Sequence, residues 1–218
     1  MIMPTPRIPM AELLAAAPRG DGHAVLVLPG LGHGDPYTAT VRTFLIDIGY
    51  DVHGWELGVN FGPTDQLIVA ATDRLVTLSN RYGPISVVGF SMGGLFARLL
   101  AGRMPERVRR VVTVCSPIHE PARSFWLPMG PVVGLWGGGD LDRMAEEIRH
   151  ELPVPCTAVY SREDGLVNWS ACVDSSDTAE SIEIGGPHVL IASNPEVLTI
   201  LGKTLARAAT SNGDQPCD

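Results

Sequence analysis

Short apolar runs that alternate with helical patterns constrain the fold of this chain more than any other feature. His23 to Leu28 contains an unbroken apolar run of strand length that ends at Pro29-Gly30, as is typical of strands buried on both faces of a sheet. Residues 36–48 then carry helical periodicity, with Pro36 near the start and Gly49 just beyond the end. A strand followed by such a helix predicts a parallel sheet, because parallel strands need a helix-sized crossover.

The same alternation continues almost to the end of the chain. After an amphipathic beginning at residues 10–17, we expect further strands at 50–55, 85–89, 108–115, 154–160 and 181–184, and further helices at 64–81, 92–102, 140–152 and 195–208. The predicted fold is α/β, with a mostly parallel sheet of about six strands and helices on both faces. We expect one domain over residues 23–210, preceded by an N-terminal segment at 1–22 and followed by a tail at 211–218.

Residues 117–139 interrupt this rhythm with many Pro, Gly and aromatic residues and no clean periodicity. We interpret them as an excursion outside the sheet. Phe125, Trp126 and Trp136 are candidates for a small lid or an apolar wall of a binding site. The alternative is that these aromatic side chains only cover the core, which is their commoner role.

Composition and charge exclude several classes of protein. The formal net charge is −8 for 218 residues, which argues against binding to nucleic acid, because that depends on clustered Lys and Arg. No run of apolar residues is long enough to cross a bilayer, and the first 20 residues lack the apolar core of a signal peptide. We therefore expect no integral membrane segment and a cytoplasmic location, and the oligomeric state stays open.

The four cysteines, Cys115, Cys156, Cys172 and Cys217, have no spacing typical of zinc ligands. No metal site is expected, and free thiols are favoured. A disulfide between Cys156 and Cys172 is an alternative that the sequence leaves open.

Gly89-Phe90-Ser91-Met92-Gly93 is a G-x-S-x-G sequence, and it lies where a predicted apolar strand meets a predicted helix. In that context Ser91 is a candidate nucleophile on a sharp, strained turn, and the small residues beside it allow close packing. The alternative is that Ser91 merely begins the helix.

A serine hydroxyl needs a base to accept its proton, and the base needs a carboxylate partner. His188, in the loop after the last predicted strand, is the preferred base, ahead of His119 and His150. Asp164 follows a predicted strand and precedes His188, so it is the preferred acid. Glu163, Asp174 and Asp177 are less favoured acids.

Backbone N–H groups that stabilise an oxyanion usually come from the residue after the nucleophile and from the loop after an earlier strand. Met92 and Leu31 fit these two positions. The loop that contains Leu31, LPGLGHG at 28–34, lacks the glycine spacing and the Lys of a phosphate-binding loop.

These motifs resemble those of the α/β-hydrolase superfamily, especially its small bacterial lipase-like and esterase-like members. The resemblance covers about residues 23–208 and is carried by LPGLGHG, GFSMGGLFAR, VVTVCSP, YSREDGLV and GPHVLIASNPEV. It implies Ser91, Asp164 and His188 as the triad and Leu31 and Met92 as the oxyanion hole. The chain differs in having Pro29 where many members have His before Gly, and in lacking room for two extra N-terminal strands or a large cap, which implies a shallow, open acyl site.

The predicted activity is hydrolysis of carboxylic esters with apolar acyl or alcohol groups, through an acyl-enzyme and without a metal or organic cofactor. Leu166 and Val189, which flank the proposed triad, are further candidates for contact with this small-molecule substrate. Thioester hydrolysis and acyl transfer would use the same residues. Haloalkane dehalogenation and epoxide hydrolysis are disfavoured, because they need a carboxylate at Ser91. A non-catalytic binding or interaction protein on the same scaffold is the alternative from another class.

Overall fold

In the computed structural model, which describes residues 8–119, 121, 124 and 138–207, six strands form a single sheet in the order β2-β1-β3-β4-β5-β6. All five pairs of neighbouring strands are parallel. The strands are β1 Ala24–Leu28, β2 Asp51–Gly54, β3 Ile85–Phe90, β4 Val108–Val114, β5 Cys156–Ser161 and β6 Ala179–Ile184. The predicted fold class is therefore confirmed.

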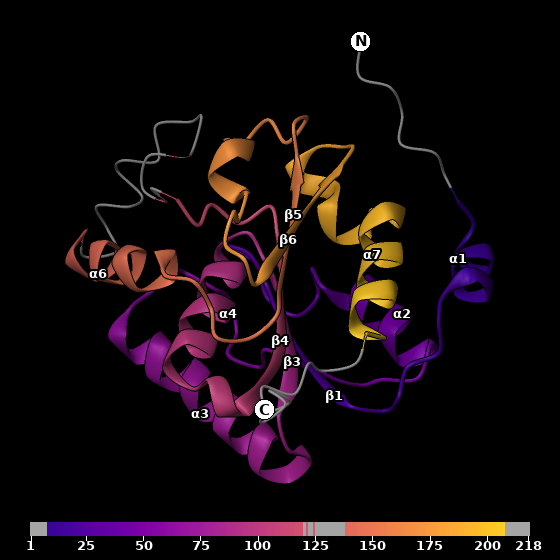
Figure 1. The fold of residues 1–218 in the computed structure, drawn as a ribbon, viewed down its shortest axis with the longest axis horizontal. Coiled ribbons are helices and arrows are strands. Elements are labelled where there is room, and N and C mark those ends of the chain that lie inside the picture. Colours follow the sequence, from indigo (N-terminus) through magenta and orange to yellow (C-terminus); the bar gives the residue numbers. More distant parts are fainter. Residues whose placement is uncertain (1–7, 120, 122–123, 125–137, 208–218) are drawn as a thin grey trace, which may run out of the picture.

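Helices cover both faces of the sheet (Figure 1). The α-helices are α1 Met10–Ala16, α2 Ala39–Asp47, α3 Asp65–Tyr82, α4 Met92–Arg103, α6 Gly138–Arg149 and α7 Pro195–Leu205. Three short 3-10 helices, η1 Pro105–Arg107, η2 Trp169–Cys172 and η3 His188–Ser193, complete the described elements. α3, α4 and α6 lie on one side of the sheet, and α1, α2 and α7 lie on the other.

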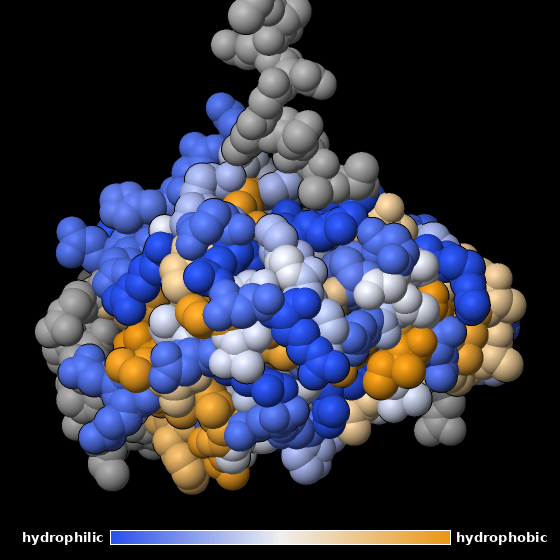
Figure 2. Space-filling model, turned by 90° about the horizontal axis from the view of Figure 1, so that it is seen from below, coloured by the Kyte–Doolittle hydropathy of each residue, from blue (hydrophilic) through white to orange (hydrophobic). Residues whose placement is uncertain are grey.

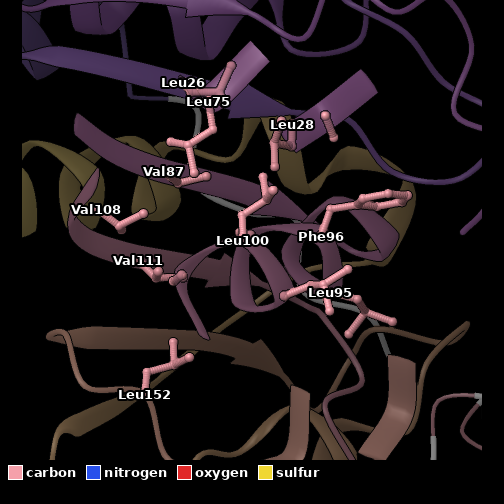
Figure 3. Packing of buried hydrophobic residues seen from close by; sticks show 14 of the residues in the cluster. Leu26, Leu28, Leu75, Val87, Leu95, Phe96, Leu100, Val108, Val111 and Leu152 are labelled. Carbon is pink, nitrogen blue, oxygen red and sulfur yellow. The ribbon is translucent and has the colours of Figure 1, made fainter. Parts of the chain in front are cut away.

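Burial on both faces explains the unbroken apolar run of the first strand. Leu26 and Leu28 of β1 belong to the core cluster on the α3 and α4 side, whereas Val25 and Val27 belong to the cluster on the opposite side. Figure 3 shows Leu26 beside Leu75 of α3 in this first cluster. Successive strand residues point to opposite faces, so a strand covered by helices on both sides needs apolar residues throughout.

The sequence pattern misplaced the ends of several elements. The helix expected at 36–48 begins only at Ala39, because the residues before it form turns that are fixed by Asp35. The Asp35 carboxylate accepts the backbone N–H groups of Trp55 and Glu56, each at 2.9 Å. β6 begins two residues earlier than expected, at Ala179, because it is an edge strand with exposed charges such as Glu180, and such strands lack a continuous apolar signal.

A buried ion pair connects α4 to the segments that pack against it. Arg98 of α4 pairs with Asp174, which lies between β5 and β6, and both side chains are buried. The same guanidinium donates to the carbonyl oxygens of Ile148 at 2.8 Å and His150 at 2.9 Å, at the end of α6. Arg98 therefore joins α4, the end of α6 and the segment before β6.

We expect Arg98→Met to lower the free energy of unfolding by about 3–5 kcal/mol, because Asp174 would stay buried without its counter-charge. Arg103→Met is the matched control: it lies on the same helix, but its ion pair with Glu147 is more exposed, so about 0–1 kcal/mol is expected. Urea-induced unfolding measures both values. Equal losses of unfolding free energy in the two variants would contradict a larger contribution of the buried pair to stability.

Candidate active site

The three residues of the predicted triad follow strands that end at the same edge of the sheet. Ser91 directly follows β3, Asp164 follows β5, and His188 begins η3 after β6. Because all these strands are parallel, their carboxyl ends share one edge. Residues far apart in the sequence are thereby brought to the same part of the fold.

Ser91 lies in a strained turn between β3 and α4. Its φ of 49° and ψ of −118° are unusual for a residue with a side chain. It occupies the position before the helix where a serine often caps, yet its side chain makes no capping hydrogen bond. The hydroxyl therefore does not serve as a cap of α4.

Close packing explains the glycines around Ser91. A Cβ on Gly93 would lie 2.4 Å from the carbonyl oxygen of Leu28, and one on Gly89 would lie 2.3 Å from that of Gly93. A Cβ on Gly94 would lie 1.9 Å from Ser116 Oγ. Gly93 and Gly94 let the start of α4 approach β1 and the residues after β4, and Gly89 lets it pack on the end of β3, because none of the three has a side chain.

Asp164 and His188 form a buried hydrogen-bonded pair. Asp164 Oδ2 lies 2.6 Å from His188 Nδ1, and Oδ1 accepts the backbone N–H groups of Leu166 at 3.0 Å and Val167 at 2.6 Å. The backbone N–H of His188 also donates to the carbonyl oxygen of Asp164 at 2.9 Å. This arrangement favours a proton on Nδ1 and leaves Nε2 to accept one.

Ser91 is linked to this pair through the end of β4. Its backbone N–H donates to the carbonyl oxygen of Val114 at 2.8 Å, and the next residue, Cys115, has its Sγ within 4.8 Å of side-chain atoms of both Asp164 and His188. Among the described residues, Ser91 Oγ makes no hydrogen bond to the His188 ring. Such bonds are often long before a substrate is bound.

Cys115 is a neighbour of the site that the sequence reasoning did not select. Burial raises the pKa of its thiol well above the usual value, and the charge of Asp164 raises it further. The thiol is therefore protonated at neutral pH and is a poor metal ligand in that state. Its position directly after the apolar strand in VVTVCSP was the available signal.

The predicted oxyanion loop lies against the serine. A Cβ on Gly30 would lie 3.3 Å from that of Ser91, so this turn passes close to the hydroxyl. Within the described part of the chain, the backbone N–H groups of Leu31 and Met92 donate to no other group. Both amides are thus free to bind an oxyanion.

The less favoured acids have other roles. Glu163 accepts the backbone N–H of Gly186 at 2.8 Å, Asp174 pairs with Arg98, and Asp177 is exposed. Free thiols are found at Cys115, Cys156 and Cys172, so the alternative disulfide between Cys156 and Cys172 is wrong. Cys217 lies outside the described residues.

The structure describes two of the five candidate substrate-binding residues, Leu166 and Val189. Leu166 is partly buried beside Asp164, whereas Val189 is 71% exposed. Phe125, Trp126 and Trp136 lie outside the described residues.

None of the described helices is long and apolar enough to cross a membrane.

Comparison with known families identifies the class to which this fold belongs. The family model described as the alpha/beta hydrolase fold matches residues 8–141. The chain belongs to this family. A search of the curated proteins gave no match.

Solved structures share the fold at low sequence identity. A structure of the metagenome-derived lipolytic enzymes LipS and LipT is 14% identical with a TM-score of 0.64, and the match covers 94% of this chain and 99% of that one. The Bacillus licheniformis lipase BlEst2 is 14% identical with a TM-score of 0.64, covering 88% and 95%. A thioesterase domain from the curacin biosynthetic pathway is 14% identical with a TM-score of 0.57, covering 86% and 93%.

We expect Gly93→Ala to destabilise the protein by several kcal/mol, because the new Cβ would collide with the carbonyl oxygen of Leu28, which is backbone and cannot easily move. Gly102→Ala is the control on the same helix, where the nearest atom would be Leu152 Cδ2 at 3.9 Å. That change should be neutral or stabilise by up to about 1 kcal/mol. Thermal unfolding compares them, and a tolerated Gly93→Ala would contradict the close approach.

Proposed function

We propose that the protein is a serine hydrolase that cleaves carboxylic esters with apolar acyl or alcohol groups. The observation that carries this proposal is the strained Ser91, whose hydroxyl makes no helix cap, at the edge of the sheet that also holds the buried Asp164–His188 pair. Acyl-transfer catalysis needs this set: a nucleophile, a base and a carboxylate that orients the base.

The proposed reaction begins when Ser91 Oγ attacks the ester carbonyl carbon and His188 Nε2 accepts its proton. The N–H groups of Leu31 and Met92 stabilise the oxyanion of the tetrahedral intermediate. The intermediate collapses to an acyl-enzyme, and His188 gives the proton to the departing alcohol. Water, activated by the same base, then releases the acid and restores Ser91. No step requires a metal or an organic cofactor.

The preference for apolar substrates rests on where exposed apolar side chains occur. Exposed apolar residues are normal on a protein surface. Figure 2 shows them among hydrophilic residues on one face of the molecule. Four of the large exposed hydrophobic residues, however, lie near the candidate site, and we take them as the proposed apolar rim. Val59 and Phe61 lie in the loop after β2, whose Asn60 bonds to the turn after β1, and Val189 and Leu190 follow His188 in η3.

Thioester hydrolysis is retained as an alternative because it uses the same groups and the same acyl-enzyme. The resemblance to a thioesterase domain extends to the fold alone. Transfer of the acyl group to an alcohol or amine instead of water would also use these groups.

Ser91→Ala should lower kcat for p-nitrophenyl esters by about 10⁴-fold or more, because no other group replaces the nucleophile. Ser79→Ala is the control, since Ser79 lies in the last turn of α3 and has no part in the proposed mechanism. A fluorophosphonate probe should label the wild type and Ser79→Ala but not Ser91→Ala. A folded wild type that neither turns over esters or thioesters nor reacts with the probe would favour a non-catalytic binding protein.

Val189→Ser should reduce kcat/KM about 3–10-fold for a p-nitrophenyl octanoate and much less for the acetate, because only the longer acyl chain reaches apolar surface. Val69→Ser is the matched control: this valine is also exposed but lies on α3. Steady-state kinetics over the acyl series measures both. Equal effects on acetate and octanoate would count against a role for Val189 in acyl recognition.

A further inference from the structure

Asn60 is a fully buried polar residue that the proposed mechanism does not use. It lies in the loop between β2 and α3, and its exposed fraction is 0%. A buried amide is costly unless its donor and acceptor groups are all paired. Its partners therefore indicate what it stabilises.

Asn60 makes three hydrogen bonds to the turn that follows β1. Its side-chain Nδ2 donates to the carbonyl oxygen of Pro29 at 2.9 Å. Its backbone carbonyl accepts the N–H of Gly32 at 2.7 Å, and its backbone N–H donates to the carbonyl of His33 at 2.8 Å. These bonds lie on both sides of Leu31, whose own N–H donates to no group of the described residues.

The oxygen of the Asn60 side-chain amide is hydrogen-bonded as well as its nitrogen. Asn60 Oδ1 accepts the N–H of Gly62 at 3.0 Å, so the amide spans its own loop and the turn after β1. Only an amide of this length supplies a donor to one carbonyl and an acceptor to one N–H. Aspartate would keep the acceptor but place a carboxylate against the carbonyl oxygen of Pro29.

The turn that Asn60 holds has little rigidity of its own. Gly30, Gly32 and Gly34 give it wide backbone freedom, and Gly32 adopts a φ of 72°. Within the described residues its internal backbone bond is the one from His33 N–H to the carbonyl of Gly30, at 3.2 Å. An oxyanion donor must nevertheless be held within a fraction of an ångström of its working position.

We propose that Asn60 is a positioning residue that holds the 29–33 turn so that the Leu31 N–H faces the oxyanion formed at Ser91. This inference rests on the proposed function, because it assigns Asn60 a task in the same acyl-transfer site. Asn60 itself does not touch the reacting atoms. It acts through the backbone of the turn, which contacts Ser91 at Gly30.

The test compares Asn60→Asp and Asn60→Ala with the wild type in hydrolysis of p-nitrophenyl butyrate. We expect kcat to fall about 10–100-fold, because one oxyanion donor is misplaced, while KM changes by less than about 3-fold, since the donor acts mainly on the transition state. The pH midpoint of kcat/KM should stay unchanged in Asn60→Ala, which adds no charge, because the Asn60 side chain donates to Pro29 and accepts from Gly62 rather than bonding to the Asp164–His188 pair. A shifted midpoint in Asn60→Ala, or a loss confined to KM in both variants, would overturn the proposal.

Thr64→Ala is the matched control for local destabilisation. Thr64 lies in the same loop, and its side chain accepts the N–H of Leu67 at 3.2 Å as the cap of α3. Its loss should lower the thermal stability but leave kcat within about 2-fold of the wild type. If Thr64→Ala lowers kcat as much as Asn60→Asp does, the effect is general loosening of the loop and the positioning role is wrong.

Hydrogen–deuterium exchange separates this proposal from the proposed function. Asn60→Asp should raise amide exchange at Gly32 and His33, whose N–H groups are hydrogen-bonded in this turn, by about 10-fold or more, whether or not the protein hydrolyses esters. If the wild type is inactive but the turn exchanges faster in Asn60→Asp, the proposed hydrolase activity is wrong. The role of Asn60 in holding the turn is then retained. Unchanged exchange in an active enzyme would overturn the role of Asn60 and leave the proposed function intact.

Discussion

The close approach of the first turn of α4 to the ends of β1 and β4 is the constraint on which the rest of the site depends. Glycines at 93 and 94 let the helix begin against the carbonyl oxygen of Leu28 and the side chain of Ser116. This contact fixes Ser91 in its strained conformation and brings it under Gly30. The position of the serine therefore follows from backbone packing and its backbone hydrogen bond to Val114, rather than from a hydrogen bond of its side chain to the helix.

Much of the fold could be predicted because its central strands are covered on both sides. The pattern around β1 and β3 requires apolar residues on both faces, so it is visible in the sequence without knowledge of any partner. The edge strand β6, with exposed Glu180 and Glu183, lacks that requirement, and its start was misplaced. The start of α2 was also misplaced, because the turns before it depend on a contact between Asp35 and the end of β2.

The residues of the candidate site could be proposed from the sequence where each follows a predicted strand. Ser91, Asp164 and His188 each follow a strand, and parallel topology brings strand ends to one edge. Cys115 directly follows β4, so the same reasoning could have placed it near the site. Asn60 and the Arg98–Asp174 pair could not be identified in this way, because their importance comes from contacts between distant segments. Asp174 illustrates this: as a carboxylate after β5 it was an alternative acid, and only the buried Arg98 shows its structural role.

Within the described residues, the loop after β2 supports the candidate site. It turns Asn60 inward to the oxyanion turn and leaves Val59 and Phe61 exposed on either side of it. One loop thus holds the proposed oxyanion donor in place and carries part of the proposed apolar rim, so substitutions there act on both. Kinetics that separate kcat from KM are needed to distinguish the two effects, because a loss of kcat/KM alone would not show which part of the loop had changed.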